Sequence, residues 1–312
     1  MPDAKVAVYG EIGIDNLISI PQPLDYERDA IVTADEYMIG GYGCNIAVLL
    51  ALWGIPARLS GYALGDDHYG HMILDMLARY PELDRSFIEI RPGIKTAFCR
   101  IIVDPSGDRT IMAFNLHERC KDPSPLTHDF LDGASHIVLD SLSQRGAFLP
   151  AAETAHKAGL TVINSDINTL DCPLIPYVDV ICNSAGLLRN KDGVSDTAAF
   201  ARQLHQKHGA AVITTDGPRA IHAIDSDGSE FWITPPRIPA EKIVDTTGAG
   251  DALKSGVTYG FTRGWPLKQC VRYGAAAGAL IIQAVGSITR EPSVEEVTAM
   301  MQETEVHDEP NQ

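Results

Sequence analysis

Residues 245–251 read Asp-Thr-Thr-Gly-Ala-Gly-Asp, and an apolar run with helical spacing follows them directly. Glycines just before a helix let backbone N–H groups point toward one place, where the helix dipole also favours negative charge. The stretch therefore predicts an anion hole formed by Gly248, Ala249 and Gly250. Asp251 closes this hole and suits a base that takes a hydroxyl proton during phosphoryl transfer. The alternative is that Asp251 caps the helix and the glycines only make a tight turn.

Upstream of this motif, apolar β-rich runs alternate with segments of helical period. The runs KVAVYG (5–10) and ARLSGYA (57–63) are separated by the helical segment CNIAVLLALWG (44–54). The alternation resumes at SHIVLD (135–140) and continues to AAVITT (210–215). This order predicts an α/β fold, a three-layer α/β/α sandwich whose mainly parallel sheet binds its ligand at the carboxyl ends of the strands.

Two stretches, 15–40 and 94–116, break this rhythm and do not look helical. In the second, KTAFCRIIVD and RTIMAF flank the sequence Pro105-Ser106-Gly107-Asp108 and predict a hairpin. We expect both stretches to leave the main sheet and to build a small β lid over the ligand crevice. The remainder then forms the nucleotide- and substrate-binding core, namely 1–14, 41–93 and 117–312.

The last third of the chain predicts a second hairpin over 220–234, which turns at Asp225-Ser226-Asp227-Gly228 and extends the edge of the main sheet. Helices are expected near 250–263 and 266–284, and another after Pro292. The acidic tail after Met301 carries little apolar material, so we expect it to be frayed.

A second motif, Gly40-Gly41-Tyr42-Gly43-Cys44-Asn45, also runs into a helix. Its glycines let a ligand approach the backbone, and Asn45 offers both a donor and an acceptor to a sugar hydroxyl. A flexible joint followed by an Asn helix cap explains the same residues. Taken alone, the motif favours that second interpretation.

In their order and separation, the two motifs resemble those of the ribokinase-like (PfkB) carbohydrate kinase family, which has a Gly-Gly motif ending in Asn near residue 45 and a late D-T-x-G-A-G-D motif. The resemblance extends over nearly the whole chain. It includes Gly10-Glu11-Ile12-Gly13-Ile14-Asp15, the Leu64-Gly65-Asp66-Asp67 and Gly70 turn, and Asp216-Gly217-Pro218-Arg219-Ala220. It implies a ribokinase-like sandwich and ATP-dependent phosphorylation of a hydroxyl of a small sugar or nucleoside.

The resemblance also implies roles for individual residues. Asp251 becomes the base, and the backbone of 248–250 binds the transferred phosphoryl group. The residues that hold the acceptor are Asp15, Gly41, Asn45 and Asp251. The residues near the nucleotide phosphates are Asn183, Thr215 and Gly217. ATP and Mg²⁺ are the implied cofactors, with K⁺ at a monovalent-cation site that includes Asp245.

Departures from the family pattern qualify these expectations. Where the family often shows Asn-x-x-Glu, this chain has Asn183-Ser184-Ala185-Gly186, so a Glu that helps to order Mg²⁺ and phosphate is absent. Asp166 is a candidate substitute, although a turn-forming Asp is the more common case. Lys254, one helical turn after Asp251, either steers ATP, pairs with Asp251 or stays solvated, and a solvated lysine is the commonest outcome.

Aromatic residues raise a related question about the acceptor. Tyr42 stands where ribokinase has Lys, and Gly13 where it has a hydroxyl-binding Asn, so the chain is not a plain ribokinase. Together with Phe98, Phe114 and His117 of the lid, Tyr42 can stack on a base or on an apolar substrate face. The same aromatics more often form the small core of the lid itself.

The composition excludes several classes of function. The chain has 312 residues with a formal net charge of −16, which argues against nucleic acid as a partner. No apolar run approaches a membrane span, and the opening residues lack the order of a signal peptide, so we expect no membrane partner and a cytoplasmic location. The six cysteines are scattered and predict neither a disulfide framework nor a zinc site, and Cys44 has no adjacent His to make it a nucleophile.

The sequence also bears on two other functions, an oxidoreductase and a sensing protein, and on a homodimer. A dinucleotide-dependent oxidoreductase needs GxGxxG after the first strand, but the chain has Gly10-Glu11-Ile12-Gly13 there. A non-catalytic sugar- or nucleoside-sensing protein on the kinase fold fits the missing Glu at position 186. Because an exposed lid has open strand edges that a second copy can cover, we expect a homodimer through the lid.

Overall fold

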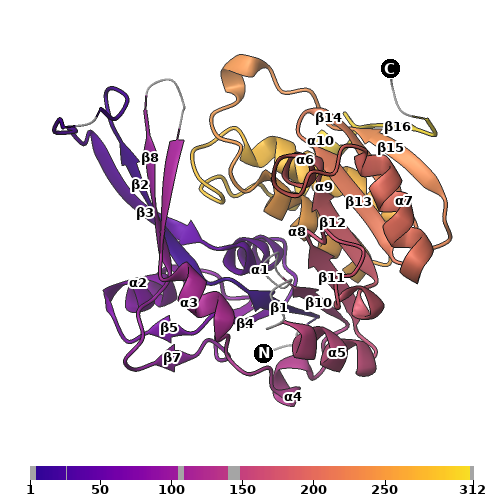
Figure 1. Cartoon of the computed structure of the whole chain (residues 1–312), viewed down its shortest axis with the longest axis horizontal. Coiled ribbons are helices and arrows are strands. Elements are labelled where there is room, and N and C mark those ends of the chain that lie inside the picture. Colours follow the sequence, from indigo (N-terminus) through magenta and orange to yellow (C-terminus); the bar gives the residue numbers. More distant parts are fainter. Residues whose placement is uncertain (1–4, 26, 105–108, 140–147, 310–312) are drawn as a thin grey trace.

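The structure is a computed structural model that describes residues 5–25, 27–104, 109–139 and 148–309. A ten-stranded sheet runs through the molecule with helices on both faces, and a four-stranded sheet stands beside it (Figure 1). The predicted three-layer α/β/α sandwich with a small second sheet is therefore confirmed. Within the described ranges, every helix is too short or too polar to cross a membrane.

The strands of the large sheet are, in spatial order, β6 (Leu83–Asp84), β4 (Ala57–Gly61), β1 (Val6–Gly10), β10 (His136–Leu139), β11 (Thr161–Ser165), β12 (Val180–Ser184), β13 (Ala211–Asp216), β14 (Arg219–Ile224), β15 (Glu230–Thr234) and β16 (Glu305–His307). In this spatial order, the strands from β6 through β4 and β1 to β13 are mutually parallel. Each of β14, β15 and β16 pairs antiparallel with the strand before it. The parallel part places all its carboxyl ends along one side of the sheet.

The far edge of this sheet confirms one prediction and corrects another. The hairpin expected over 220–234 is β14 and β15, and it extends the sheet as predicted. The prediction of a frayed tail is wrong for Glu305–His307, which forms β16 and pairs with β15, with Val306 opposite Ile233. Pairing gives partners to backbone groups of β15 that would otherwise form an open edge.

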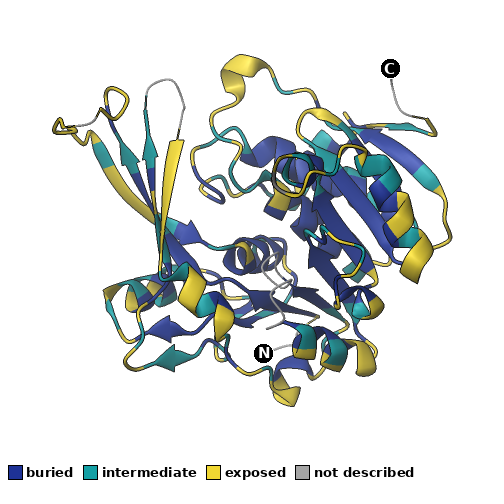
Figure 2. Ribbon diagram, viewed as in Figure 1, coloured by how far each residue is buried: buried dark blue, intermediate teal, exposed yellow. Residues whose placement is uncertain are grey.

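The helices are α1 (Tyr42–Leu52), α2 (His68–Leu77), α3 (Leu116–Lys121), α4 (His128–Leu131), α5 (Leu149–Lys157), α6 (Ala185–Asp192), α7 (Thr197–His208), α8 (Ala249–Thr262), α9 (Leu267–Ile281) and α10 (Val294–Met301), with 3-10 turns at Ile175–Tyr177 and Ala240–Lys242. Successive residues of β1 serve opposite faces of the sheet. Val6 and Val8 pack with α1, α2, α8, α9 and α10, whereas Ala7 and Tyr9 pack with α3 to α7. The central strands are buried on both faces (Figure 2), as a parallel sheet between two helical layers requires.

The small sheet, as we call it from here on, has the order β3 (Ala34–Gly40), β2 (Gly13–Ser19), β8 (Phe98–Val103) and β9 (Arg109–Phe114). It consists of two antiparallel hairpins joined by parallel pairing of β2 with β8. The hairpin expected over 94–116 is therefore present, although its predicted turn at 105–108 lies outside the described residues. A separate pair is formed by β5 (Leu64–Gly65) and β7 (Ile90–Arg91). The residue bounds proposed for core and lid stay a prediction.

Candidate active site

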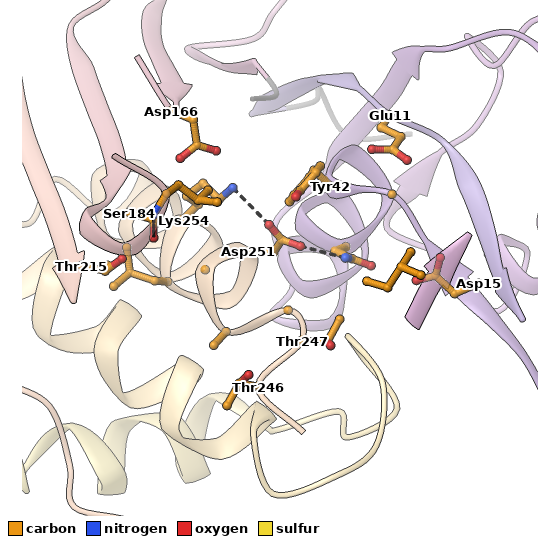
Figure 3. A pocket seen from close by; sticks show the side chains of 18 of the residues that line it. Glu11, Asp15, Tyr42, Asp166, Ser184, Thr215, Thr246, Thr247, Asp251 and Lys254 are labelled. Carbon is orange, nitrogen blue, oxygen red and sulfur yellow. Dashed lines mark hydrogen bonds and ion pairs between the residues drawn. The ribbon is translucent and has the colours of Figure 1, made fainter. Parts of the chain in front are cut away.

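A cavity of about 620 Å³ opens between the small sheet, the N-termini of α1 and α8, and the carboxyl ends of the parallel strands. Glu11 follows β1, Asp166 follows β11 and Thr215 lies near the end of β13, and all three line the cavity. Figure 3 shows Asp251 between Asp166 and Thr215 on one side and Asp15 on the other. The cavity thus lies at the side of the sheet where α/β folds bind their ligands.

The start of α8 is shaped by two glycines with different surroundings. Gly248 caps the helix at a φ of 80°, and a Cβ there would approach the carbonyl oxygen of Ser287 to 2.4 Å. At Gly250 a Cβ would meet nothing within 4 Å, because this residue faces open space. Gly248, Ala249, Gly250 and Asp251 all line the cavity, so the N-terminal end of α8, whose first backbone N–H groups have no partner within the helix, faces the cavity.

Asp251 joins the two glycine-containing motifs. The residue is only 4% exposed, and its Oδ2 accepts a hydrogen bond of 2.8 Å from Nδ2 of Asn45. Asn45 lies in α1, and its Oδ1 accepts a bond of 3.1 Å from the hydroxyl of Ser287. The predicted base and a predicted acceptor-binding residue are therefore in direct contact, although 206 positions separate them in the sequence.

Lys254 is buried beside Asp251, so the interpretation of a solvated lysine is wrong. Its Nζ lies 3.1 Å from Oδ1 of Asp251 and 5.0 Å from the ring centre of Tyr42. Burial alone would lower the pKa of this ammonium, but the carboxylates of Asp251 and Asp166 outweigh burial and raise the pKa. The side chain therefore stays charged inside the protein.

Asp15 enters the cavity from β2 and explains the paired glycines of the early motif. A Cβ on Gly40 would come within 2.5 Å of the Asp15 carboxyl carbon, and one on Gly41, where φ is 90°, within 2.7 Å of the Glu11 carbonyl oxygen. Burial, followed by the charges of Asp251 and Asp245, raises the pKa of Asp15 to about 7. Near neutral pH this carboxyl can thus donate as well as accept a hydrogen bond.

Asp245 does not line the cavity itself but immediately precedes Thr246 and Thr247, which do. Its Oδ1 accepts bonds from the backbone and hydroxyl of Thr247, and its Oδ2 accepts a bond of 3.0 Å from the N–H of Gly286. Nη1 of Arg109 in β9 reaches across and lies 2.7 Å from Asp245 Oδ1. This ion pair connects the edge of the small sheet to the loop before α8.

The residues expected near the nucleotide lie together at the ends of β12 and β13. Asn183, Thr215 and Gly217 all line the cavity. Nδ2 of Asn183 donates to the carbonyl of Ile167 at 2.9 Å, whereas its buried Oδ1 has no partner among the described residues. Asp166 lies beside them with a left-handed φ of 52° and lines the cavity as well.

A family model described as pfkB family carbohydrate kinase matches residues 3–294 of the chain. The chain belongs to this family. It is a carbohydrate or nucleoside kinase, a phosphotransferase with an alcohol group as acceptor.

Individual relatives of this pfkB-family kinase agree with the assignment. The acarbose 7(IV)-phosphotransferase of an Actinoplanes strain is 26% identical, over 88% of this chain and 90% of that protein. The ribokinase of Arabidopsis thaliana, whose structure is complexed with ribose and ATP, superimposes with a TM-score of 0.79 at 19% identity over 96% and 99% of the two chains. The nucleoside kinase of Burkholderia thailandensis, in complex with inosine, gives 0.73 at 22% identity over 95% and 96%.

The aromatic residues of the small sheet of this pfkB-family kinase lie on the face away from the cavity. In the strand register, Asp15 is opposite Cys99 and Cys99 opposite Ala113, and this row faces the cavity. Phe98 and Phe114 belong to the alternate row, where their rings stack at 4.5 Å. Phe98 also packs against the ring of Tyr69 in α2, whereas Phe114 is exposed. His117 does not line the cavity either, whereas Tyr42 does.

Sequence reasoning missed three features of the kinase site. It named Lys254 without its burial, and it did not name Arg109, whose contact with Asp245 spans 136 positions. Glu11 was quoted only as part of a motif, yet it is buried and lines the cavity. Cys44 is fully buried, and burial raises the pKa of its thiol, which agrees with the absence of a nucleophilic role.

Proposed function

We propose that this kinase transfers the γ-phosphoryl group of ATP to a hydroxyl of a small sugar or nucleoside, with Asp251 as the base. One observation carries the proposal: a buried carboxylate at the first turn of α8, beside the Gly248–Gly250 backbone and in contact with Asn45. The helix N-terminus offers N–H groups to a phosphoryl group. The carboxylate is then within reach of a hydroxyl aimed at the same phosphorus.

In the proposed reaction, Asp251 accepts the proton of the acceptor hydroxyl as its oxygen forms a bond to the γ-phosphorus. The bond between that phosphorus and the bridging oxygen breaks, and its electron pair leaves with ADP. Backbone N–H groups of Gly248, Ala249 and Gly250 stabilise the charge on the equatorial oxygens. Asn45, bonded to both Asp251 and Ser287, holds the carboxylate in place.

The nucleotide end offers oxygen ligands that fit Mg²⁺. Asn183, whose buried Oδ1 lacks a partner among the described residues, and Asp166 both line this end of the cavity. No group of three or more His, Cys, Asp or Glu side chains that could hold a metal ion occurs in the described part of the chain. Magnesium needs few protein ligands, because phosphates and water complete its shell, so Asp166 and Asn183 suffice to hold it. When bound, Mg²⁺ neutralises phosphate charge.

The acceptor side supports a hydroxyl-rich compound. Asp15, Glu11, Asn45 and the backbone at Gly41 line that end of the cavity and provide acceptors and donors in a small volume. Acarbose, ribose and inosine appear in the descriptions of three similar proteins, and each compound is a sugar or a nucleoside. This supports the same class of acceptor for this chain. We keep a cytoplasmic location and a homodimer through the exposed edge of the small sheet as parts of the proposal.

A monovalent cation at Asp245 is a separate part of the proposal. Arg109 already places a positive charge 2.7 Å from Asp245 Oδ1. Potassium would therefore have to share or displace this contact, and Arg109 supports a kinase whose dependence on K⁺ is weak.

The test is ADP release from ATP and Mg²⁺ with ribose, ketohexoses, deoxysugar acids and nucleosides as acceptors, measured beside Asp251→Asn. We expect release that depends on one acceptor class and falls by roughly 1,000-fold in the variant, because a general base is removed without loss of shape. Acceptor binding without phosphate transfer in the wild-type protein would instead support a sugar- or nucleoside-sensing protein. Asp75→Asn, an exposed change on α2, is the control.

A further inference from the structure

Lys254 is buried and charged, which is rare for a lysine that has no functional role. It is 6% exposed in α8 and is one of the residues that line the cavity, and its Nζ lies between the Asp251 carboxylate and Asp166 (Figure 3). Lysine is almost never buried unless it is paired, and a buried pair costs desolvation that a hydrophobic residue would avoid. Asn45 already orients Asp251, so orientation alone does not explain a second partner.

The charged and titratable groups around Lys254 come from several elements. Asp251 is on its own helix, Asp166 follows β11, Tyr42 is at the start of α1, and Cys182 is in β12. Among the described residues that line the cavity, the lysine and arginine side chains are Lys254 and Arg109, and Arg109 is engaged by Asp245. On the side of the cavity formed by α1, α8 and the parallel strands, Lys254 therefore supplies positive charge beside Asp251 and Asp166, whose carboxylates would repel ATP.

We propose that Lys254 is a further catalytic residue, whose ammonium group contacts the γ-phosphoryl group of ATP while it holds Asp251. This inference rests on the proposed function, because it needs ATP as donor and Asp251 as base. An ammonium has three N–H donors, and the contact with Asp251 occupies one of them. Asp251 takes the proton of the hydroxyl that attacks the γ-phosphorus, so an Nζ that lies 3.1 Å from an Asp251 oxygen is within reach of the phosphoryl oxygens around that phosphorus.

The chemistry assigned to Lys254 is electrostatic. It gives up no proton: the hydroxyl proton goes to Asp251, the new oxygen–phosphorus bond forms, and the electron pair of the broken bond leaves with ADP. The ammonium stabilises charge on the equatorial oxygens and also holds the Asp251 carboxylate in place. The Tyr42 ring, 5.0 Å from Nζ, holds the ammonium over the cavity.

The experiment compares Lys254→Met, which keeps length and loses charge, with Lys254→Arg, which keeps charge. Lys268→Met is the matched control, because Lys268 also lies over an aromatic ring, 5.1 Å from the centre of Phe231, but is exposed and does not line the cavity. We expect Lys254→Met to lower kcat by roughly 100-fold or more and Lys254→Arg to recover at least about tenfold of that. Acceptor affinity, measured by calorimetry, should be retained in both.

A direct readout on the wild-type protein avoids any folding defect of the variants. With lysine labelled at Nζ, the Lys254 ¹⁵N resonance should shift when the non-hydrolysable analogue AMP-PNP binds with Mg²⁺, and not with ADP, which lacks the γ-phosphate. The resonance is assigned as the one missing in Lys254→Arg. Equal spectra with AMP-PNP and ADP would overturn the inference, as would a Lys254→Met kcat within about threefold of wild type.

Failure of the inference can be told apart from failure of the proposed function. If the wild type transfers phosphate, Asp251→Asn does not, and Lys254→Met does, only the role of Lys254 is lost. If the wild type transfers no phosphate to any acceptor, the proposed function is lost, and the inference that rests on it is overturned as well.

Discussion

The cavity has two sides, which different kinds of contact hold in place. The core side is formed by α1, α8 and the ends of the parallel strands, and the small-sheet side by β2, β8 and β9. On the core side, Asp251 is buried and both its carboxylate oxygens have partners, Asn45 and Lys254. On the other side, the Arg109 side chain is 36% exposed and reaches Asp245 from β9, an edge strand that is exposed throughout. Removing one partner of a buried pair is costly, whereas an exposed pair contributes little. The comparison suggests that chemistry depends on the core and that acceptor binding depends on the small sheet.

The largest effects are expected from two alanine substitutions in the first turn of α8, which test whether the chemistry depends on the core side. In Gly250→Ala, the methyl group enters open space on the cavity side, so we expect normal stability and a loss of kcat of roughly 100-fold or more by obstruction of the anion hole. In Gly248→Ala, the methyl group meets Ser287 at a φ of 80°, so we expect a loss of stability of roughly 1–3 kcal/mol as well. Thermal unfolding and steady-state kinetics separate the two. Wild-type turnover in Gly250→Ala would argue against an anion hole there.

A second test compares two buried asparagines, one on each side. Asn45→Ala removes the 2.8 Å bond to Asp251, and we expect kcat to fall by roughly 10- to 100-fold because the base loses its orientation. Asn16 lies in β2 and bonds Asp35 at 2.5 Å, away from the cavity. Asn16→Ala should cost stability and leave kcat within about threefold. Equal kinetic defects in both would contradict a separate chemical role for the core side.

The small-sheet side is tested with two arginines of the same sheet. Arg109→Ala removes the contact with Asp245, and we expect KM for the acceptor to rise by roughly three- to tenfold with little change in kcat. Activation by K⁺ should become stronger in this variant, because the Asp245 carboxylate loses its cation. Arg100→Ala is the control, since Arg100 lies near the outer-face rings of Phe98 and Phe114. A larger effect of Arg100 than of Arg109 would reverse the assignment of the two faces.

The change with the smallest expected effect on turnover concerns the pH dependence of stability. The folded-state pKa of Asp15 is about 7, against an unfolded value of about 3.9. The folded protein thus binds more protons between these values, so stability falls as pH rises from about 4 to about 7 and is constant above. Asp15→Asn should lose this dependence and be more stable than wild type near pH 8 by up to roughly 4 kcal/mol, because about three pKa units separate the folded and unfolded values. Urea unfolding near pH 5 and pH 8 measures it, and an identical pH dependence in both proteins would disprove it.

The parts of the site that sequence reasoning predicted are those whose conformation is local. Gly248 must be glycine because of its own φ and the nearby chain, and such glycines before an apolar helical run are visible in the sequence. The same holds for Gly41 before α1. Alternating apolar runs likewise predicted the parallel sheet, which brings these helix starts to one side.

The features that the sequence left open or missed depend on residues far apart. Whether Phe98 faces the cavity is decided by strand register, since a shift of one residue would exchange the two faces. The sequence of β16 is typical of a polar tail, and these residues form a strand only because the edge of β15 is available for pairing. The sequence contains no pattern that pairs Arg109 with Asp245.

By itself, then, the amino-acid sequence determined the α/β fold, the two glycine-containing helix starts and Asp251 as the candidate base, because these follow from backbone freedom and periodicity within short segments. Only the tertiary structure decided that Lys254 is buried against Asp251 and that Arg109 connects the small sheet to the loop before α8. The physical reason is that burial and charge pairing are properties of the space around a side chain. That space is formed by segments that meet only when the whole chain has folded.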